Sequence, residues 1–126
     1  MGILDGLMGN VSEVDIKSVE KELELVIVES EKVEKAYKLI RDLIVFTNTR
    51  LILIDKQGVT GKKVEYHSIP YRSVVHFSIE TAGTFDFEAE LKIWLSNSGE
   101  PIEKRFTKQS DIYKIQSVLA AYVLKE

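Results

Sequence analysis

The chain has 126 residues, of which 44% are hydrophobic, and its net charge is -3; this length and apolar share fit one domain with an ample core. The absence of cysteine excludes disulfides, thiolate zinc sites and cysteine nucleophiles. The acidic balance argues against a nucleic-acid partner, and no apolar run approaches the roughly 18–20 residues of a spanning helix. We therefore expect one soluble, cytoplasmic domain over residues 1–126.

The first ten residues combine apolar side chains with glycines, which disfavour a helix. The apolar side chains are those of Ile3, Leu4, Leu7 and Met8. One interpretation is a frayed terminus. The other is an apolar arm that orders against a neighbouring subunit or a bilayer surface, because exposed apolar clusters tend to mark contact sites.

Residues 12–28 have the periodicity of an amphipathic helix. Its apolar stripe consists of Ile16, Val19, Leu23, Val26 and Ile27. Ser12 or Asp15 is expected to cap its start. The β-branched residues near position 28 favour an early exit from the helix.

About seven strand-like runs follow between residues 33 and 107. They cover residues 33–40, 42–46, 50–54, 64–70, 73–81, 87–95 and 102–107. Residues 43–46 and 51–54 are continuously apolar, so both faces of this hairpin are expected to be buried. Pro70 is expected at an edge or a strand end. In residues 73–81 the alternation places Val75, Phe77 and Ile79 on one apolar face.

A last amphipathic helix is predicted over residues 110–124, with Ile112, Ile115, Leu119 and Tyr122 on its apolar stripe. This order of elements indicates a mainly β fold with α: a bent antiparallel barrel or sandwich of about seven strands, closed by its last helix. Such a shape is typical of a docking module whose loops and exposed edges carry the function.

No catalytic constellation stands out, and we expect neither an enzyme nor a cofactor. His67 and His76 lie on successive predicted strands and could hold a metal, but their spacing lacks a metal motif and ordinary surface histidines are the favoured interpretation. Glu88 and Glu90 share one strand face and could serve acid–base chemistry or bind calcium. Lys92 and Trp94 continue that face, so solvent or a subunit is its favoured neighbour.

Two features remain as candidate binding sites. Trp94, the single tryptophan, falls on the polar face of its strand, which favours an interface hot spot, the alternative being a side chain packed under a loop or the N-terminal helix. Lys56, Lys62 and Lys63 surround a glycine-containing loop. They could touch anionic head groups weakly, the alternative being a solvated turn.

Four segments together resemble the bacterial pleckstrin-homology (PH) domain family. They are residues 38–58 (KLIRDLIVFTNTRLILIDKQG), 69–74 (IPYRSV), 78–83 (SIETAG) and 90–94 (ELKIW), and the resemblance covers nearly the whole chain. It implies a PH-like fold, with about seven antiparallel strands in two roughly orthogonal sheets, capped by a C-terminal helix; the additional N-terminal helix comes from the periodicity above.

The resemblance also implies homo-oligomerisation, because members of this family assemble into rings. Eukaryotic PH domains bind phosphoinositides through a basic loop between the first two strands, which here reduces to Ile40-Arg41-Asp42, so that ligand is not expected. The sequence therefore predicts a non-enzymatic module that assembles with itself and docks a protein partner. The alternative is a peripheral binder of anionic lipid or of a small ligand.

Overall fold

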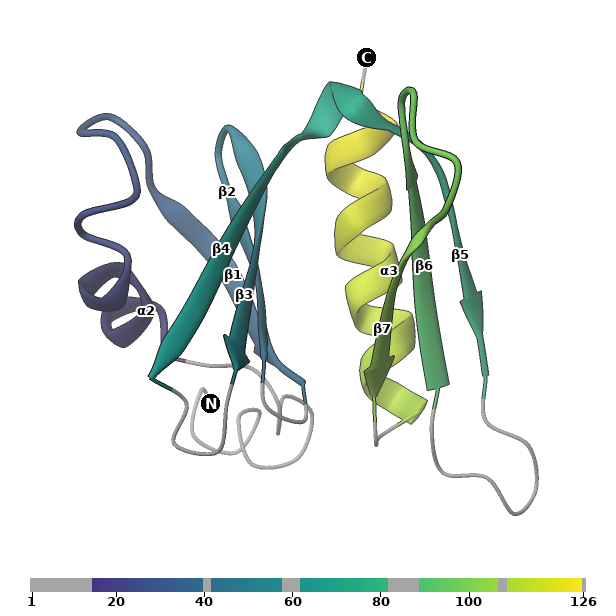
Figure 1. Cartoon of the computed structure of the whole chain (residues 1–126), viewed down its shortest axis with the longest axis horizontal. Coiled ribbons are helices and arrows are strands. Elements are labelled where there is room, and N and C mark those ends of the chain that lie inside the picture. Colours follow the sequence, from purple (N-terminus) through teal and green to yellow (C-terminus); the bar gives the residue numbers. More distant parts are fainter. Residues whose placement is uncertain (1–14, 40–41, 58–61, 82–88, 107–108, 126) are drawn as a thin grey trace. The chain divides into compact units, whose positions relative to one another are not determined.

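The elements of the computed structural model, which describes residues 15–39, 42–57, 62–81, 89–106 and 109–125, follow the expected order. They are α2 (Ile16–Glu22), β1 (Val33–Lys38), β2 (Leu43–Thr47), β3 (Arg50–Gln57), β4 (Lys63–Pro70), the short 3-10 helix η1 (Tyr71–Ser73), β5 (Val74–Glu80), β6 (Ala89–Leu95), β7 (Ile102–Phe106) and α3 (Gln109–Val123). The strands form a four-stranded antiparallel sheet, β1-β2-β3-β4, and a three-stranded one, β5-β6-β7 (Figure 1). The predicted seven strands, two antiparallel sheets, N-terminal helix and C-terminal helix are confirmed. The chain divides between Ser68 and Ile69 into two compact units.

In the N-terminal unit, α2 covers one face of the β1-β2-β3-β4 sheet. Val19 and Leu23 on α2 and the turn after it are buried in a cluster with Val33, Ala36, Leu43, Val45, Ile52 and Ile54. Val45 pairs with Ala36 on one side and with Ile52 on the other, so these side chains share one sheet face. The apolar stripe predicted for the N-terminal helix is therefore the surface through which α2 packs on this face of the sheet.

The N-terminal helix is shorter than the prediction of residues 12–28. Within the described residues it ends at Glu22, and residues 12–14 lie outside them. Beyond Leu23 the chain continues in turns, in which the N–H groups of Val26 and Ile27 both donate to the Leu23 carbonyl. Val26 and Ile27 still pack against the cluster, because turns aim both β-branched side chains at the sheet. Asp15 occupies the N-cap position, without a side-chain capping bond.

The hairpin of β2 and β3 is apolar on both sides, as predicted. Every residue from Leu43 to Thr47 and from Leu51 to Ile54 is buried. β3 continues to Gln57, beyond the predicted end at Ile54. Pro70 ends β4, the last strand in the order of its sheet, which agrees with its missing N–H.

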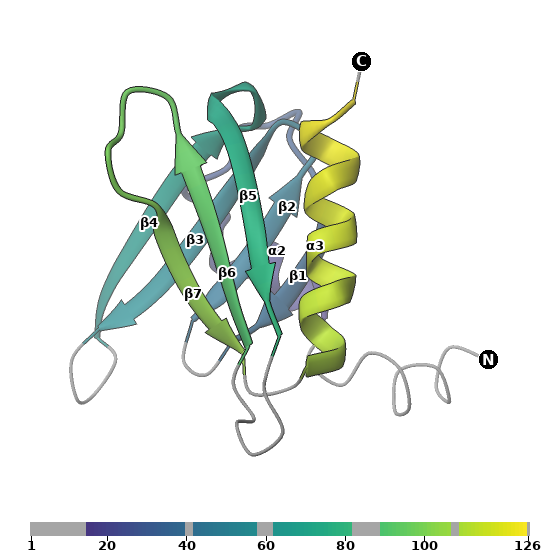
Figure 2. The same ribbon diagram turned by 90° about the vertical axis from the view of Figure 1, so that its right-hand side faces the viewer.

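In the C-terminal unit, α3 packs along the β5-β6-β7 sheet and η1 (Figure 2). Ile112, Ile115 and Leu119 on the helix are fully buried, as are Leu91 and Ile93 on the central strand. The predicted stripe of α3 is confirmed for these three residues. Its fourth member, Tyr122, is half-buried and stacks on Tyr71 of η1 with ring centroids 4.7 Å apart.

The prediction for one residue of β5 is wrong. Val75 was expected on an apolar face with Phe77 and Ile79, but its side chain is 60% exposed. The pairing of β5 with β6 shifts register between Val74 and His76. Because such a bulge adds one residue to the strand, Val74 takes the inward place and Val75 turns outward.

We expect Leu23→Ala to lower the free energy of unfolding by about 2–4 kcal/mol, because it removes a fully buried side chain from the cluster under α2. Leu25→Ala is the matched control, since Leu25 is 97% exposed, and should change it by less than about 0.5 kcal/mol. Urea denaturation followed by circular dichroism measures both. The samples should be dilute, because self-association would add to apparent stability. Equal losses in the two variants would contradict this packing.

Candidate functional site

The predicted site residues divide into three groups. Ile3, Leu4, Leu7 and Met8 of the N-terminal arm lie outside the described residues, so their role stays a prediction. The three lysines lie at the facing ends of β3 and β4: Lys62 and Lys63 are exposed, and the Lys56 Nζ is 3.7 Å from Glu22 Oε2. Trp94 lies on the central strand of the three-stranded sheet.

One face of the β5-β6-β7 sheet carries the charged and aromatic side chains, and we call it the polar face. It consists of His76, Ser78 and Glu80 on β5, Glu90, Lys92 and Trp94 on β6, and Glu103 and Arg105 on β7, as their pairing shows. Opposite charges face each other across β6 and β7, Glu90 beside Arg105 and Lys92 beside Glu103. Such cross-strand pairs stabilise a sheet.

Trp94 stacks on His76 at one end of the polar face. The two residues are direct partners across β5 and β6, and their rings lie 4.3 Å apart between centroids at an angle of 24°. Trp94 is half-buried, and His76 is exposed. Sequence reasoning placed Trp94 on this face but missed its partner, because the bulge at Val74 decides which β5 residue stands opposite.

The two histidines belong to different sheets, and only one of the two paired carboxylates lies within the described residues. His67 lies on β4, in the other sheet, and is not paired with His76. Glu90 Oε1 lies 3.9 Å from Lys92 Nζ, and Glu88 is outside the described residues. Across the part of the chain that the structure describes, no group of three or more His, Asp or Glu side chains could hold a metal ion.

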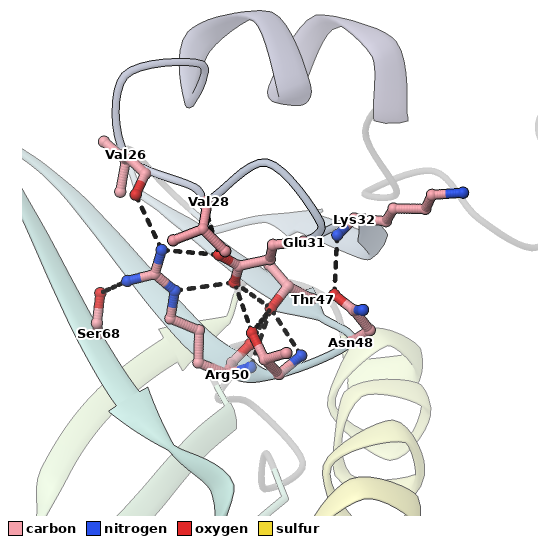
Figure 3. Close-up of polar contacts among 9 residues, drawn as sticks. Val26, Val28, Glu31, Lys32, Thr47, Asn48, Arg50 and Ser68 are labelled. Atoms are coloured by element: carbon pink, nitrogen blue, oxygen red, sulfur yellow. Dashed lines mark hydrogen bonds and ion pairs between the residues drawn. The ribbon is translucent and has the colours of Figure 1, made fainter.

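A second site, which sequence reasoning missed, is the connection between α2 and β1. Its organiser is Glu31, whose side chain is 1% exposed. The guanidinium of Arg50 binds both carboxylate oxygens, with Nε 2.8 Å from Oε2 and Nη2 2.8 Å from Oε1 (Figure 3). Thr47 and Thr49 donate their hydroxyls to Oε2, at 2.6 and 2.9 Å, and the Val28 N–H donates to Oε1 at 3.2 Å.

Arg50 extends this network to two further segments. Its Nη2 donates to the Val26 carbonyl and its Nη1 to Ser68 Oγ on β4, both at 2.9 Å (Figure 3). Thr47 Oγ1 in turn accepts the N–H groups of Thr49 and Arg50 at the β2–β3 turn. The Glu31–Arg50 pair therefore joins the α2–β1 loop, the β2–β3 turn and β4.

The electrostatic consequence is a strongly acidic Glu31. Hydrogen bonding from Arg50 is the main cause that lowers its pKa from 4.5 to about 2, with further bonds from Thr47, Val28 and Thr49, while burial opposes the shift. A carboxylate that accepts several donors is stabilised in its charged form. The same pair raises the pKa of Arg50.

The Glu31–Arg50 pair with its hydrogen bonds, which we call the clamp, determines which side chains the α2–β1 loop exposes. Val26 and Ile27 pack inward, whereas Leu25 is 97% and Val28 58% exposed. The loop backbone is bonded at both ends of this stretch, at the Val26 carbonyl and the Val28 N–H. Two apolar side chains are thus held outward on an ordered loop. The one signal in the sequence is that Leu25 falls off the apolar stripe of the predicted helix.

We expect Glu31→Gln to lower the free energy of unfolding at neutral pH by about 2–4 kcal/mol, because it leaves the Arg50 charge partly buried and unpaired. Since the folded pKa of Glu31 lies below its unfolded value, its contribution is complete above pH 4.5 and is lost as pH falls toward 2. Urea midpoints at several pH values should show the gap between wild type and variant narrowing over that interval.

Glu29→Gln is the matched control for this prediction. Glu29 is exposed and lies two residues from Glu31, so its substitution should change stability by less than about 0.5 kcal/mol at every pH. A gap between wild type and Glu31→Gln that stays constant down to pH 3 would contradict the assignment of the low pKa to this network.

The comparisons with known proteins agree on one family. The model of the bacterial PH domain family matches residues 2–123. Two proteins of Bacillus subtilis (strain 168) are similar to the chain: the uncharacterized protein YjqA is 57% identical over 96% of this chain and 98% of its own length, and the uncharacterized protein YozO is 37% identical over 82% and 88%. None of the helices in the described residues is long and apolar enough to cross a membrane.

Solved structures give the same answer for the fold. A PH domain from Shewanella amazonensis SB2B superposes with a TM-score of 0.84 at 55% identity, covering 96% of this chain and 98% of its own. A protein with a PH domain from Shewanella loihica PV-4 gives a TM-score of 0.76 at 50% identity, with coverage of 89% and 96%. The fold is therefore PH-like, as its residues implied, and the chain belongs to the bacterial pleckstrin-homology domain family.

Proposed function

We propose that this protein is a non-enzymatic interaction module of the cytoplasm, which assembles into a ring-like homo-oligomer and docks a protein partner. The observation that carries the docking role is the stacked pair of His76 and Trp94 on the polar face. Membership of the PH family supports a binding module over a catalyst. The cysteine-free sequence is compatible with a reducing compartment.

The polar face has the anatomy of a docking surface. A tryptophan at one end supplies a large, rigid contact area, and tryptophan is enriched in interface hot spots. The stack on His76 restrains the indole before a partner arrives, so little conformational entropy would be lost on binding. The charged side chains of Glu103, Arg105 and Glu80 continue this face away from Trp94, and would give the docking surface a polar border on that side.

Self-assembly is supported by the apolar side chains on the described surface. Leu25, Val28, Val75, Tyr113 and Leu124 are all more than half exposed. Larger exposed apolar areas mark contact sites on soluble proteins. These residues lie on ordered elements, which favours association with defined partners over indiscriminate contact.

The non-enzymatic character is supported by where the perturbed charges lie. Glu31 has the strongly lowered pKa typical of functional sites, but Arg50, Thr47, Thr49 and the Val28 N–H occupy its carboxylate. Its task is to hold the loop in place.

The alternative, a peripheral binder of anionic lipid or a small ligand, has weaker support. Lys56 forms an ion pair with Glu22, which leaves Lys62 and Lys63 as the exposed cations of that loop end. Each would contribute roughly 1 kcal/mol near an acidic bilayer, which is too little for a single copy to bind tightly. The protein-docking proposal therefore takes precedence.

Light scattering in line with size exclusion tests the assembly. We expect a stable multiple of 14.4 kDa over a range of protein concentrations, as a closed ring would give. A monomer at every concentration would refute self-assembly, and with it the avidity that repeated docking sites supply.

Acrylamide quenching of fluorescence tests the role of the polar face, because Trp94 is the single tryptophan. If this face is kept for a different protein, the quenching constant should be the same within about 20% in the assembled protein and in samples diluted until it dissociates. A surface left free is equally open to the quencher in both states. A several-fold fall on assembly would show that Trp94 is a subunit contact and would overturn its assignment to partner docking.

A further inference from the structure

The displayed part of the α2–β1 loop is both apolar and acidic. We call it the acidic tip and define it as Glu24, Leu25, Val28 and Glu29, all exposed. Between Lys21 and Lys32 the chain contains no basic residue. Leu25 follows Glu24 and Val28 precedes Glu29 in the sequence, so each exposed apolar side chain has a carboxylate as its neighbour.

The acidic tip is ordered before any contact is made. The Leu23 carbonyl accepts the Val26 and Ile27 N–H groups, and the Val28 carbonyl accepts the Glu31 N–H at 3.0 Å. The Glu31–Arg50 clamp holds the backbone at Val26 and Val28 (Figure 3). A surface of this kind loses little freedom on docking.

The exposed face formed by α3 and the two residues after it carries two lysines. We call it the basic stripe and define it as Tyr113, Lys114, Ser117, Ala121, Leu124 and Lys125, all exposed. Residues 112–125 contain two lysines and neither Asp nor Glu, and Asp111 and Glu126 flank this stretch. The Leu124 N–H donates to the Ala120 carbonyl at 2.9 Å, so the helical hydrogen bonding reaches Leu124. The two residues in the middle of the stripe, Ser117 and Ala121, have small side chains.

We propose that the acidic tip of one copy docks on the basic stripe of a second copy of this chain. Leu25 and Val28 would lie over Ser117 and Ala121, and Glu24 and Glu29 would meet Lys114 and Lys125. This inference rests on the proposed self-assembly and names its contact. Because the two surfaces differ, the contact is heterologous and passes from copy to copy in one direction, which produces closed rings when the rotation closes.

Charge complementarity selects a second copy over a bilayer as the occupant. The carboxylates of the acidic tip would be repelled by anionic head groups. The lysines of the basic stripe are the counter-charges that the tip lacks, and they border apolar side chains of matching kind. The carboxylates of the acidic tip and the lysines of the basic stripe would thus neutralise each other in the contact.

Reversed charges test the pairing. We expect the double variant Glu24→Lys/Glu29→Lys, and separately Lys114→Glu/Lys125→Glu, to raise the apparent dissociation constant of assembly at least tenfold, because like charges would then face each other. The chain that carries all four substitutions should recover most of the loss. In-line light scattering across a dilution series measures this, and circular dichroism and urea midpoints confirm that each variant is folded.

Two controls carry the same changes of net charge at other exposed positions. Glu65→Lys/Glu100→Lys matches the first variant, and Lys17→Glu/Lys62→Glu matches the second; neither should move the dissociation constant by more than about threefold. If the wild type assembles and the four charge reversals leave the mass of the assembly unchanged, this contact is wrong, while the proposed function stands. Loss in both halves without recovery in the combined chain would overturn the direct pairing. A wild type that is monomeric throughout would refute the assembly itself.

Discussion

The paired charges of Glu31 and Arg50 hold together three segments that are distant in the sequence. A carboxylate removed from water is costly unless donors surround it, and here five hydrogen bonds from Arg50, Thr47, Thr49 and Val28 do so. The geometry is available because Arg50 begins β3 while Thr47 ends β2. The conformation of the α2–β1 loop therefore depends on the β2–β3 hairpin, because Arg50 and Glu31 bind the loop backbone at Val26 and Val28.

This dependence explains how much of the molecule could be predicted from sequence. The apolar runs and alternations between residues 33 and 107 and the helical period after residue 110 are local signals, and they located the seven strands and the C-terminal helix to within a few residues. The end of α2 was misplaced because its stripe, Val26 and Ile27 included, still points inward after the helix has stopped. Nothing local separates a helix from a series of turns that buries the same side chains.

The candidate surfaces were harder to predict, for a related reason. Trp94 was visible as an aromatic residue in a polar series, but its stack on His76 needs the β5–β6 register. Leu25 and Val28 could be recognised as displayed only once Arg50 had been placed beside Val26, which is 24 positions away. Side chains that act through long-range hydrogen bonds leave no periodic pattern, so the composition of a loop says little about what it presents.

The bulge at Val74 has a consequence for colloidal behaviour. β5 is at one end of its sheet order, and such a strand offers unpaired amide groups to any extended chain nearby. By interrupting the regular ladder between Val74 and His76, the bulge leaves at most the stretch from His76 to Glu80 as a template for an added strand. Its charged end at Glu80 shortens that template further. At this edge the irregular ladder is therefore a device of the kind that limits edge-to-edge pairing between sheets.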